Sequence, residues 1–499
     1  MSDKILKPTI QVTIFSFIGI GLGFANQIIL AYYFGSGAER DAYFAASTIP
    51  LYISSVFLGS IGAVFLSSYI NVKTQQSEID AKIFLNSVIN STAVILGVIT
   101  VLGIIFSKQI LRLSVPGFNE AELNIASENL RILFPTIIFI VLLSVLGSVY
   151  QSVHHFLIPA IEGVITPILS LIVVVVANKW MGIRSLSWAT LWGNLLSFLF
   201  LLGFLIRRKQ LIFKWSLNNK HLKVMLISAL PLLFAGFIYR FSSVWERVVA
   251  SKLPQGSISY LGYGNQLLAA MAVVTTGGIS TIFFPLLSKA WSEGNMIALK
   301  NYFSQGIRIL LCITIPVTLL FLVVRMPVIA LFFERGKFDH TSTIGVSNTL
   351  AFMMGAFIFQ SLGGIIVRAF YFMNMTVKLS IISAIEVFLY VVFSFIFCKY
   401  YSYAGLAIAL SLSAMCNVLM SSYFINKKIK FLNKKLAGDF FRVLFASFVP
   451  YLAIVCIQRF TGLENIFAIG LLYLLFYAIM ILFILPLEET VIIRKKFLK

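Results

Sequence analysis

The chain consists of long, solidly apolar runs separated by short polar connectors, and this pattern predicts a series of membrane-spanning helices. Each run is long enough to cross a bilayer. Barrel strands are excluded, because their residues alternate between apolar and polar and these runs do not. Helices are expected at about 10–34, 44–71, 83–106, 129–151, 158–177, 186–206, 224–250, 258–287, 305–324, 345–373, 378–398, 404–425, 440–459 and 465–486. The expected fold is an all-α polytopic membrane protein with about 14 transmembrane helices.

Composition agrees with this pattern and excludes other classes of protein. Of 499 residues, 59% are hydrophobic and 11% are charged. This composition is more apolar and less charged than that of soluble globular proteins. The net charge of +21 does not indicate nucleic-acid binding, because lysines and arginines gather in the connectors, where they set orientation and meet anionic lipid. The four cysteines lie singly in apolar runs, which argues against a disulfide framework or a zinc site.

The connectors also predict an orientation. Three basic segments, 207–223, 427–435 and 494–499, fall on one side of the membrane if fourteen helices are present. Connectors on the opposite side, such as 178–185 and 251–257, carry one or two basic residues each. Since positive segments favour the cytoplasm, both chain termini are expected there.

An internal repeat appears at an offset of roughly 218 residues. The turn Pro116-Gly117-Phe118 after the third helix has a counterpart in Gly336-Lys337-Phe338 after the ninth, and Phe65 has one in Phe283. The repeat predicts two six-helix lobes of equal orientation around a central cavity, as in transporters built from parallel repeats. The expected domains are an N-terminal lobe at 1–206, a basic cytoplasmic linker at 207–223, a C-terminal lobe at 224–425, and two further helices with a basic tail at 426–499.

Several short motifs stand in order between about residues 10 and 425. They are Gly23-Phe24, Ala31-Tyr32-Tyr33-Phe34-Gly35, Asp41-Ala42-Tyr43-Phe44 with Pro50, Pro116-Gly117-Phe118, Leu133-Phe134-Pro135, Gly256-Ser257-Ile258-Ser259, Tyr263-Gly264-Asn265 and Gly336-Lys337-Phe338. This set resembles the MurJ/MviN lipid flippase family. The resemblance implies the fold of the multidrug/oligosaccharidyl-lipid/polysaccharide (MOP) exporter superfamily. It also implies transport of lipid-linked sugars, such as the peptidoglycan precursor, across the bacterial inner membrane.

The chain departs from the family pattern at three cationic positions. Flippases of the peptidoglycan precursor lipid II typically carry an arginine in helix one where this chain has Asn26. In the expected helix at 44–71 they carry a basic pair where this chain has Ser54-Ser55. In the expected helix at 258–287 they carry an arginine where it has Gln266. Asp41 matches a family acidic position, which implies a gating or coupling role. In place of the missing cations, the expected helix at 224–250 carries Arg240, Glu246 and Arg247. This set of charges is similar to that of relatives associated with surface-polysaccharide export.

The charged candidates follow from what a pyrophosphate head group needs. An unpaired charge is very costly in a low-dielectric core, and arginine offers phosphate a planar fork of donors. Arg240 lies mid-helix and is either a head-group ligand or the partner of an internal acid such as Glu246. Glu246 and Arg247 point about 100° apart near a helix end, where snorkelling to the interface is easy. Arg368 is either a cavity residue or an interfacial anchor beside aromatic residues.

The neutral candidates are polar residues at membrane depth, where polar atoms must face protein or water. They either hydrogen-bond sugar hydroxyls or hold helices together. They are Asn26, Ser54, Ser55, Asn265 and Gln266.

The preferred hypothesis is a flippase that moves an undecaprenyl-pyrophosphate-linked saccharide across the bacterial inner membrane by alternating access. The saccharide is either lipid II or a surface-polysaccharide repeat unit: the ordered motifs favour the first, the missing cations the second. Alternatives are a cation-coupled multidrug exporter of the same fold and a non-transporting envelope scaffold. No enzyme site and no nucleotide-binding motif is found, so transport is expected to use an ion gradient, membrane potential or product gradient without a cofactor. Expected partners are the lipid-linked oligosaccharide, membrane lipids and envelope-glycan synthesis enzymes.

Overall fold

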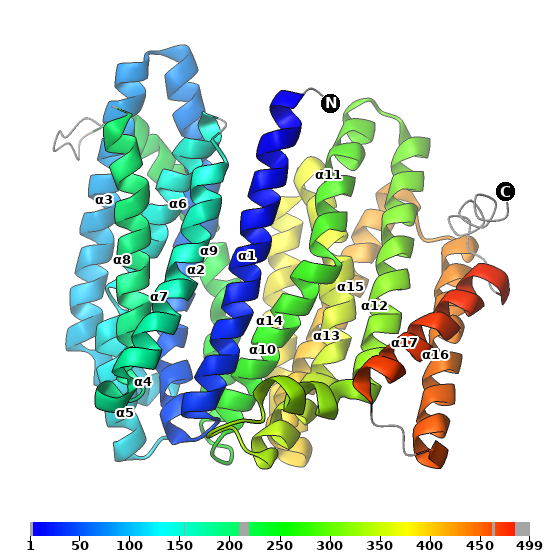
Figure 1. Cartoon of the computed structure of the whole chain (residues 1–499). Coiled ribbons are helices and arrows are strands. Elements are labelled where there is room, and N and C mark those ends of the chain that lie inside the picture. The colour runs from blue at the N-terminus through cyan, green and yellow to red at the C-terminus, as the bar shows by residue number, and fades with distance from the viewer. Residues whose placement is uncertain (1–2, 154, 209–218, 462–464, 485–499) are drawn as a thin grey trace. The chain divides into compact units, whose positions relative to one another are not determined.

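The computed structural model describes all residues except 1–2, 154, 209–218, 462–464 and 485–499. The described residues form helices joined by short connections, which confirms the all-α prediction (Figure 1). The helices are α1 Asp3–Phe34, α2 Ala38–Gln75, α3 Glu78–Ile105, α4 Ser107–Ser114, α5 Glu120–Leu133, α6 Thr136–Ser152, α7 Leu157–Met181, α8 Arg184–Arg207, α9 Lys220–Ala250, α10 Ser257–Thr275, α11 Gly277–Ser292, α12 Met296–Phe333, α13 His340–Phe372, α14 Thr376–Tyr401, α15 Tyr403–Ile429, α16 Lys434–Thr461 and α17 Ile466–Ile479, followed by a π-helical turn at Met480–Ile484.

Each apolar run predicted from sequence coincides with one helix or with two consecutive helices. Among the described residues, 12 segments are long and apolar enough to cross a membrane. The run at 258–287 is divided into α10 and α11 at Thr276, and the last apolar helix, Ile466–Leu482, is shorter than the others. The run at 129–151 begins earlier, because α5 and α6 continue one another across Pro135. The estimate of 14 helices is thus approximate.

The helices pack into two compact units. The first unit comprises Met1–Ser259 and Arg335–Phe338, and the second comprises Tyr260–Glu334 and Asp339–Lys499. Helix α9, which the repeat assigns to the C-terminal lobe, packs along α2 in the first unit. The central part of the predicted linker, 209–218, lies outside the described residues.

Helix α2 is central to the first unit, where it packs against α3, α5, α6 and α9. Its buried face carries small residues such as Ala45, Ala46 and Ser60, which allow helices to approach closely. Larger rings fill the space toward α3, where Phe65 stacks on Phe84 at 5.9 Å between ring centroids. A long helix with contacts on several faces can therefore hold polar side chains away from lipid.

Two equivalent glycine contacts in the first unit support the internal repeat. A Cβ added at Gly336 would collide with the carbonyl of Tyr32 at the end of α1, and a Cβ at Gly117 would collide with the carbonyl of Ser251 after α9. Adding the repeat offset of roughly 218 to Gly117 and Tyr32 gives Gly336 and Ser251 to within one residue. The Lys337 amide also donates to the Tyr32 carbonyl at 2.9 Å, which places the 335–338 turn against the Gly35 turn.

Replacement of Gly35 by alanine is expected to destabilise this turn. Gly35 has φ +58, and its missing Cβ leaves room for the Lys337 carbonyl. A left-handed conformation costs a non-glycine residue about 1–2 kcal/mol, and the steric collision adds to this. The thermal midpoint of the detergent-solubilised protein should fall. Gly37→Ala is the matched control, because Gly37 has φ −79 and an added Cβ there meets nothing within 4 Å. An equal effect of both substitutions would contradict the role of the turn.

The second unit is built around α12, α13, α14 and α15. Buried rings join distant segments, as where Phe303 of α12 packs on Phe431 at 4.6 Å. Helix α16 is fastened to α12 by a buried ion pair between Arg308 Nε and Asp439 Oδ2 at 2.8 Å. The Tyr477 hydroxyl of α17 donates to the Cys312 carbonyl at 2.8 Å. The last two helices, orange and red in Figure 1, are therefore integral to this unit.

Candidate functional site

Four charged side chains of the first unit lie buried near the start of α2 and the end of α9. They are Arg40, Asp41, Glu246 and Arg247, here called the buried charge cluster, and their exposed fractions lie between 1% and 8%. Two arginines and two acids make the cluster neutral overall. Charges are buried in proteins when they are paired and hydrogen-bonded. Asp41, Glu246 and Arg247 each have such partners.

Asp41 binds the beginning of α10. Its carboxylate accepts hydrogen bonds from the backbone amides of Gly256 and Ser259, each at 2.7 Å, and from the Ser259 hydroxyl at 2.5 Å. Free amide groups and the helix dipole make a helix N-terminus favourable for a negative charge. Asp41 therefore fixes the first turn of α10 against the start of α2.

Arg247 links α9 to both neighbouring segments. Its Nε donates to the Thr48 hydroxyl at 3.1 Å, and its Nη1 donates to the Ile258 carbonyl at 3.2 Å. The same Nη1 pairs with Glu246 Oε1 at 3.1 Å. Both side chains are buried, so neither snorkels to the interface, although the helix end would make this easy.

Arg40 is a component of the site that the sequence analysis did not single out. Its guanidinium lies 4.4 Å from the centre of the Phe44 ring and 5.4 Å from that of Tyr43, and it donates to the Gln27 side chain at 3.4 Å. The sequence indicates this cation–π contact, because Tyr43 and Phe44 follow Arg40 by three and four residues and therefore share its face of the helix.

Arg240 stands apart from the buried charge cluster. It is exposed on α9, with its guanidinium 5.7 Å from the Tyr239 ring centre, whereas Glu246 is buried and pairs with Arg247. It lies seven residues before Arg247, about 10 Å along the helix axis. Of the two arginines on this stretch of α9, Arg240 is the one whose side chain is exposed and Arg247 the one that is buried.

The neutral candidates of the first unit are mostly engaged with protein. Asn26 and Ser170 of α7 exchange hydrogen bonds at 3.0 and 3.3 Å, and the Ser55 hydroxyl donates to the Tyr52 carbonyl at 2.9 Å. The contact of Asn26 with α7 matches the helix-packing alternative, whereas the Ser55 bond lies within α2. The buried Ser54 hydroxyl has no hydrogen-bond partner among the described residues.

The candidates in the second unit lie on two helices. Asn265 and Gln266 are half-buried on α10, and the Gln266 side-chain oxygen has no hydrogen-bond partner in the part of the chain that the structure describes. Arg368 near the end of α13 lies 5.7 Å from the centre of the Phe284 ring of α11. This cation–π contact agrees with the aromatic-anchor alternative.

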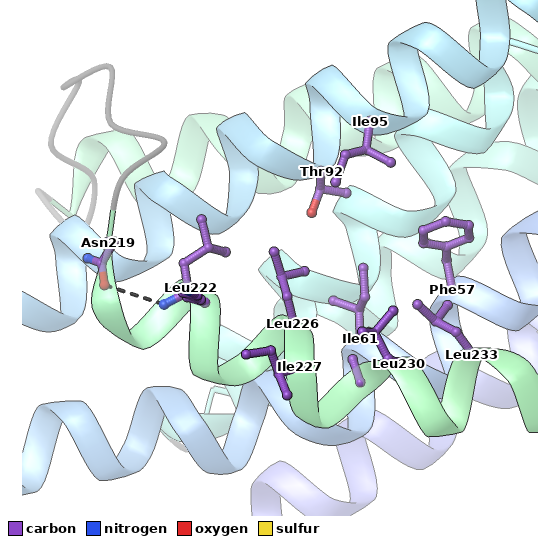
Figure 2. Close-up of a pocket in the computed structure, with 12 residues that line it drawn as sticks. Phe57, Ile61, Thr92, Ile95, Asn219, Leu222, Leu226, Ile227, Leu230 and Leu233 are labelled. Carbon is purple, nitrogen blue, oxygen red and sulfur yellow. Dashed lines mark hydrogen bonds between the residues drawn. The ribbon is translucent and has the colours of Figure 1, made fainter.

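A cavity of about 510 Å³ lies between α2, α3 and α9 in the first unit (Figure 2). Its walls are apolar apart from Thr92 and one end, where Asn219 and Lys223 lie, and Asn219 accepts a hydrogen bond from the Leu222 amide. Its volume is in the range of ligand pockets, about 300–1,000 Å³. Such a lining suits a hydrocarbon chain and not a saccharide. Within the described residues, no three His, Cys, Asp or Glu side chains could hold a metal ion.

The arrangement of the helices is similar to that of solved structures with the fold of MOP superfamily transporters. A solved structure entitled "Lipid II flippase MurJ, inward closed conformation" matches 98% of this chain and 100% of that chain, with a TM-score of 0.84 and 24% identity. An inward-facing multidrug resistance MATE family transporter of the MOP superfamily matches 83% of this chain and 94% of its own, with a TM-score of 0.71.

A family model described as "Lipid II flippase MurJ" matches residues 30–483, and the chain therefore belongs to the MurJ family. A probable lipid II flippase MurJ of Buchnera aphidicola subsp. Acyrthosiphon pisum is 28% identical over 94% of this chain and 92% of its own length. The lipid II flippase MurJ of Burkholderia cenocepacia is 24% identical over 85% of this chain and 84% of its own.

Proposed function

We propose that this protein is a flippase for a lipid-linked saccharide, with lipid II as the first candidate substrate. The observation that carries the proposal is the family match over residues 30–483, which spans both units. A lipid-linked substrate is favoured over a drug because the curated relatives are named for lipid II. The protein would act in a bacterial inner membrane as a transporter and not as an enzyme, with both termini in the cytoplasm.

The proposed transport places different parts of the substrate on different surfaces. The saccharide pyrophosphate would cross through a polar path while the isoprenoid chain remains in an apolar environment. Alternating access of the two lobes would expose the head group first inside and then outside, driven by an ion gradient, membrane potential or product gradient. Envelope-glycan synthesis enzymes would supply and consume the substrate.

Reconstitution provides the direct test. The purified full chain is placed in liposomes with fluorescent lipid II, and the fraction accessible to an impermeant reagent is followed over time. Protein-dependent loss of the protected inner-leaflet fraction is expected, beyond that of protein-free liposomes. A protected fraction that stays unchanged with folded protein would reject lipid II as the substrate, and the same result with the second candidate substrate below would leave the scaffold alternative.

A second candidate substrate is a surface-polysaccharide repeat unit on the same carrier. The neutral residues Asn26, Ser54 and Gln266 stand where lipid II flippases typically have cations, and this departure favours it. The same assay with a repeat unit of different sugars separates the two substrates. Faster movement of lipid II supports the first candidate, and faster movement of the repeat unit supports the second.

Arg240→Ala is expected to slow flipping of either substrate by roughly 10- to 100-fold. An exposed guanidinium can donate to the pyrophosphate, and a charge-assisted hydrogen bond contributes about 1.5–3 kcal/mol. Arg240→Lys should recover part of the rate, because it keeps the charge and loses the fork. The thermal midpoint should not change, since the side chain is exposed. Wild-type flipping by Arg240→Ala would remove this residue from the substrate path.

A further inference from the structure

A carboxylate lies inside the second unit, between two long helices. Glu386 is half-buried on α14, and the Asn417 side-chain amide of α15 donates to its Oε2 at 2.6 Å. The Ser421 hydroxyl in turn donates to Asn417 Oδ1 at 3.3 Å. The three side chains form a hydrogen-bonded chain across the α14–α15 contact.

The three hydrogen-bonded side chains lie at membrane depth. Glu386 is the eleventh of 26 residues in α14, and Asn417 is the fifteenth of 27 in α15. Both helices are long and apolar enough to cross a membrane. An ionisable residue at such a depth is costly and is usually functional.

The charged groups on the helices packed against Glu386 are distant along the axes. On α14 itself, Lys378 is eight residues away, about 12 Å, and lies 5.6 Å from the Phe424 ring centre. Lys399 lies thirteen residues away, about 20 Å. On α15, the cations are Lys427 and Lys428 in the last turn, and on α13 the cation is Arg368, over Phe284. Among the described residues, Glu386 forms no ion pair.

The other acid in the long helices of this unit has a different partner. Asp439 lies 2.8 Å from Arg308 and 3.3 Å from Arg442, so this acid is paired with two cations. An arginine stabilises the carboxylate and disfavours the neutral acid. An amide can serve both states, because it donates to a carboxylate through nitrogen and accepts from a carboxylic acid through oxygen. The Glu386 environment is therefore suited to a change of protonation.

We propose that Glu386 is a proton-binding site, and that its proton uptake and release accompany the transport cycle. On uptake, an aqueous proton adds to the carboxylate, and the resulting O–H donates to Asn417 Oδ1 after the amide turns. On release, the proton returns to water and the amide nitrogen again donates to Oε2. The coupling rests on the proposed flippase function, whereas proton binding itself does not.

The first experiment measures protonation without transport. Infrared difference spectra of the full chain in lipid nanodiscs are recorded during a pH titration. A protonated-carboxyl band that is present in wild type and lost in Glu386→Gln is expected, because glutamine keeps a hydrogen-bonding partner for Asn417. Glu293→Gln, at an exposed acid of the same unit, should leave that band unchanged. A titration without a band assigned to Glu386 would show a structural hydrogen bond and overturn the proposal.

The second experiment measures coupling. Flipping is followed in liposomes with and without an imposed pH gradient. Wild type should respond to the gradient, and Glu386→Gln should lose that response while Glu386→Asp keeps part of it. A variant that responds as wild type does, or a rate that follows sodium and not pH, would overturn the assignment. If wild type moves no lipid at all, the flippase function fails, and the infrared titration still decides whether Glu386 binds a proton.

Discussion

Asp41→Ala is expected to destabilise the protein by about 3–5 kcal/mol and to abolish most transport. The substitution leaves the buried amides of Gly256 and Ser259 without their acceptor, and hydrogen bonds to a charged group contribute about 1.5–3 kcal/mol each. It also removes one of two acids from a neutral cluster, so that two buried arginines and a single buried carboxylate remain. Thermal and denaturant unfolding in detergent measure the first effect, and the liposome assay measures the second.

Two companion variants make this expectation specific. Asp41→Asn keeps one acceptor oxygen and the shape of the side chain, so its loss of stability should be smaller while its loss of transport remains. Glu39→Ala removes a neighbouring acid that is exposed, and it should change stability by less than about 0.5 kcal/mol. Equal effects of the Asp41 and Glu39 substitutions would mean that the Asp41 carboxylate only makes the turn hydrophilic and does not hold α10 in place.

The helices could be predicted from sequence because the membrane leaves few choices. A long apolar segment must satisfy its backbone internally, and a helix does so without help from distant residues. The break between α10 and α11 was missed, although Gly277 and Gly278 follow Thr276 and glycine is a poor helix former. The apolar run alone gave no reason to divide it.

The site was harder to predict because its contacts are distant in sequence. Asp41 and Ser259 are 218 residues apart, the same distance as the repeat offset, so equivalent positions of the two halves meet each other. The repeat could have indicated this contact. The burial of Arg247 could not be predicted in this way, since it depends on Thr48 and the Ile258 carbonyl converging on one guanidinium.

Membership of the family and the geometry of the site lead to separate roles for the arginines of α9. The Arg247 guanidinium donates to protein groups, so it would affect transport by holding those groups in place. The exposed Arg240 guanidinium can contact substrate directly. Stability and transport should therefore respond differently to substitutions at Arg247 and Arg240. This separation does not follow from sequence, where both residues are cations in one apolar helix.

Arg247→Ala is expected to destabilise the protein by about 3–5 kcal/mol, because it leaves Glu246 as a buried charge without its ion-pair partner. Adding Glu246→Gln to the same chain should recover part of this loss, since the remaining amide carries no charge. Unfolding of the two single variants, the double variant and wild type gives the coupling energy directly. Arg240→Ala is the contrasting variant, with slow flipping at unchanged stability. If the double variant is no more stable than Arg247→Ala, the cost lies in the lost Thr48 and Ile258 contacts, and the ion pair contributes nothing to stability.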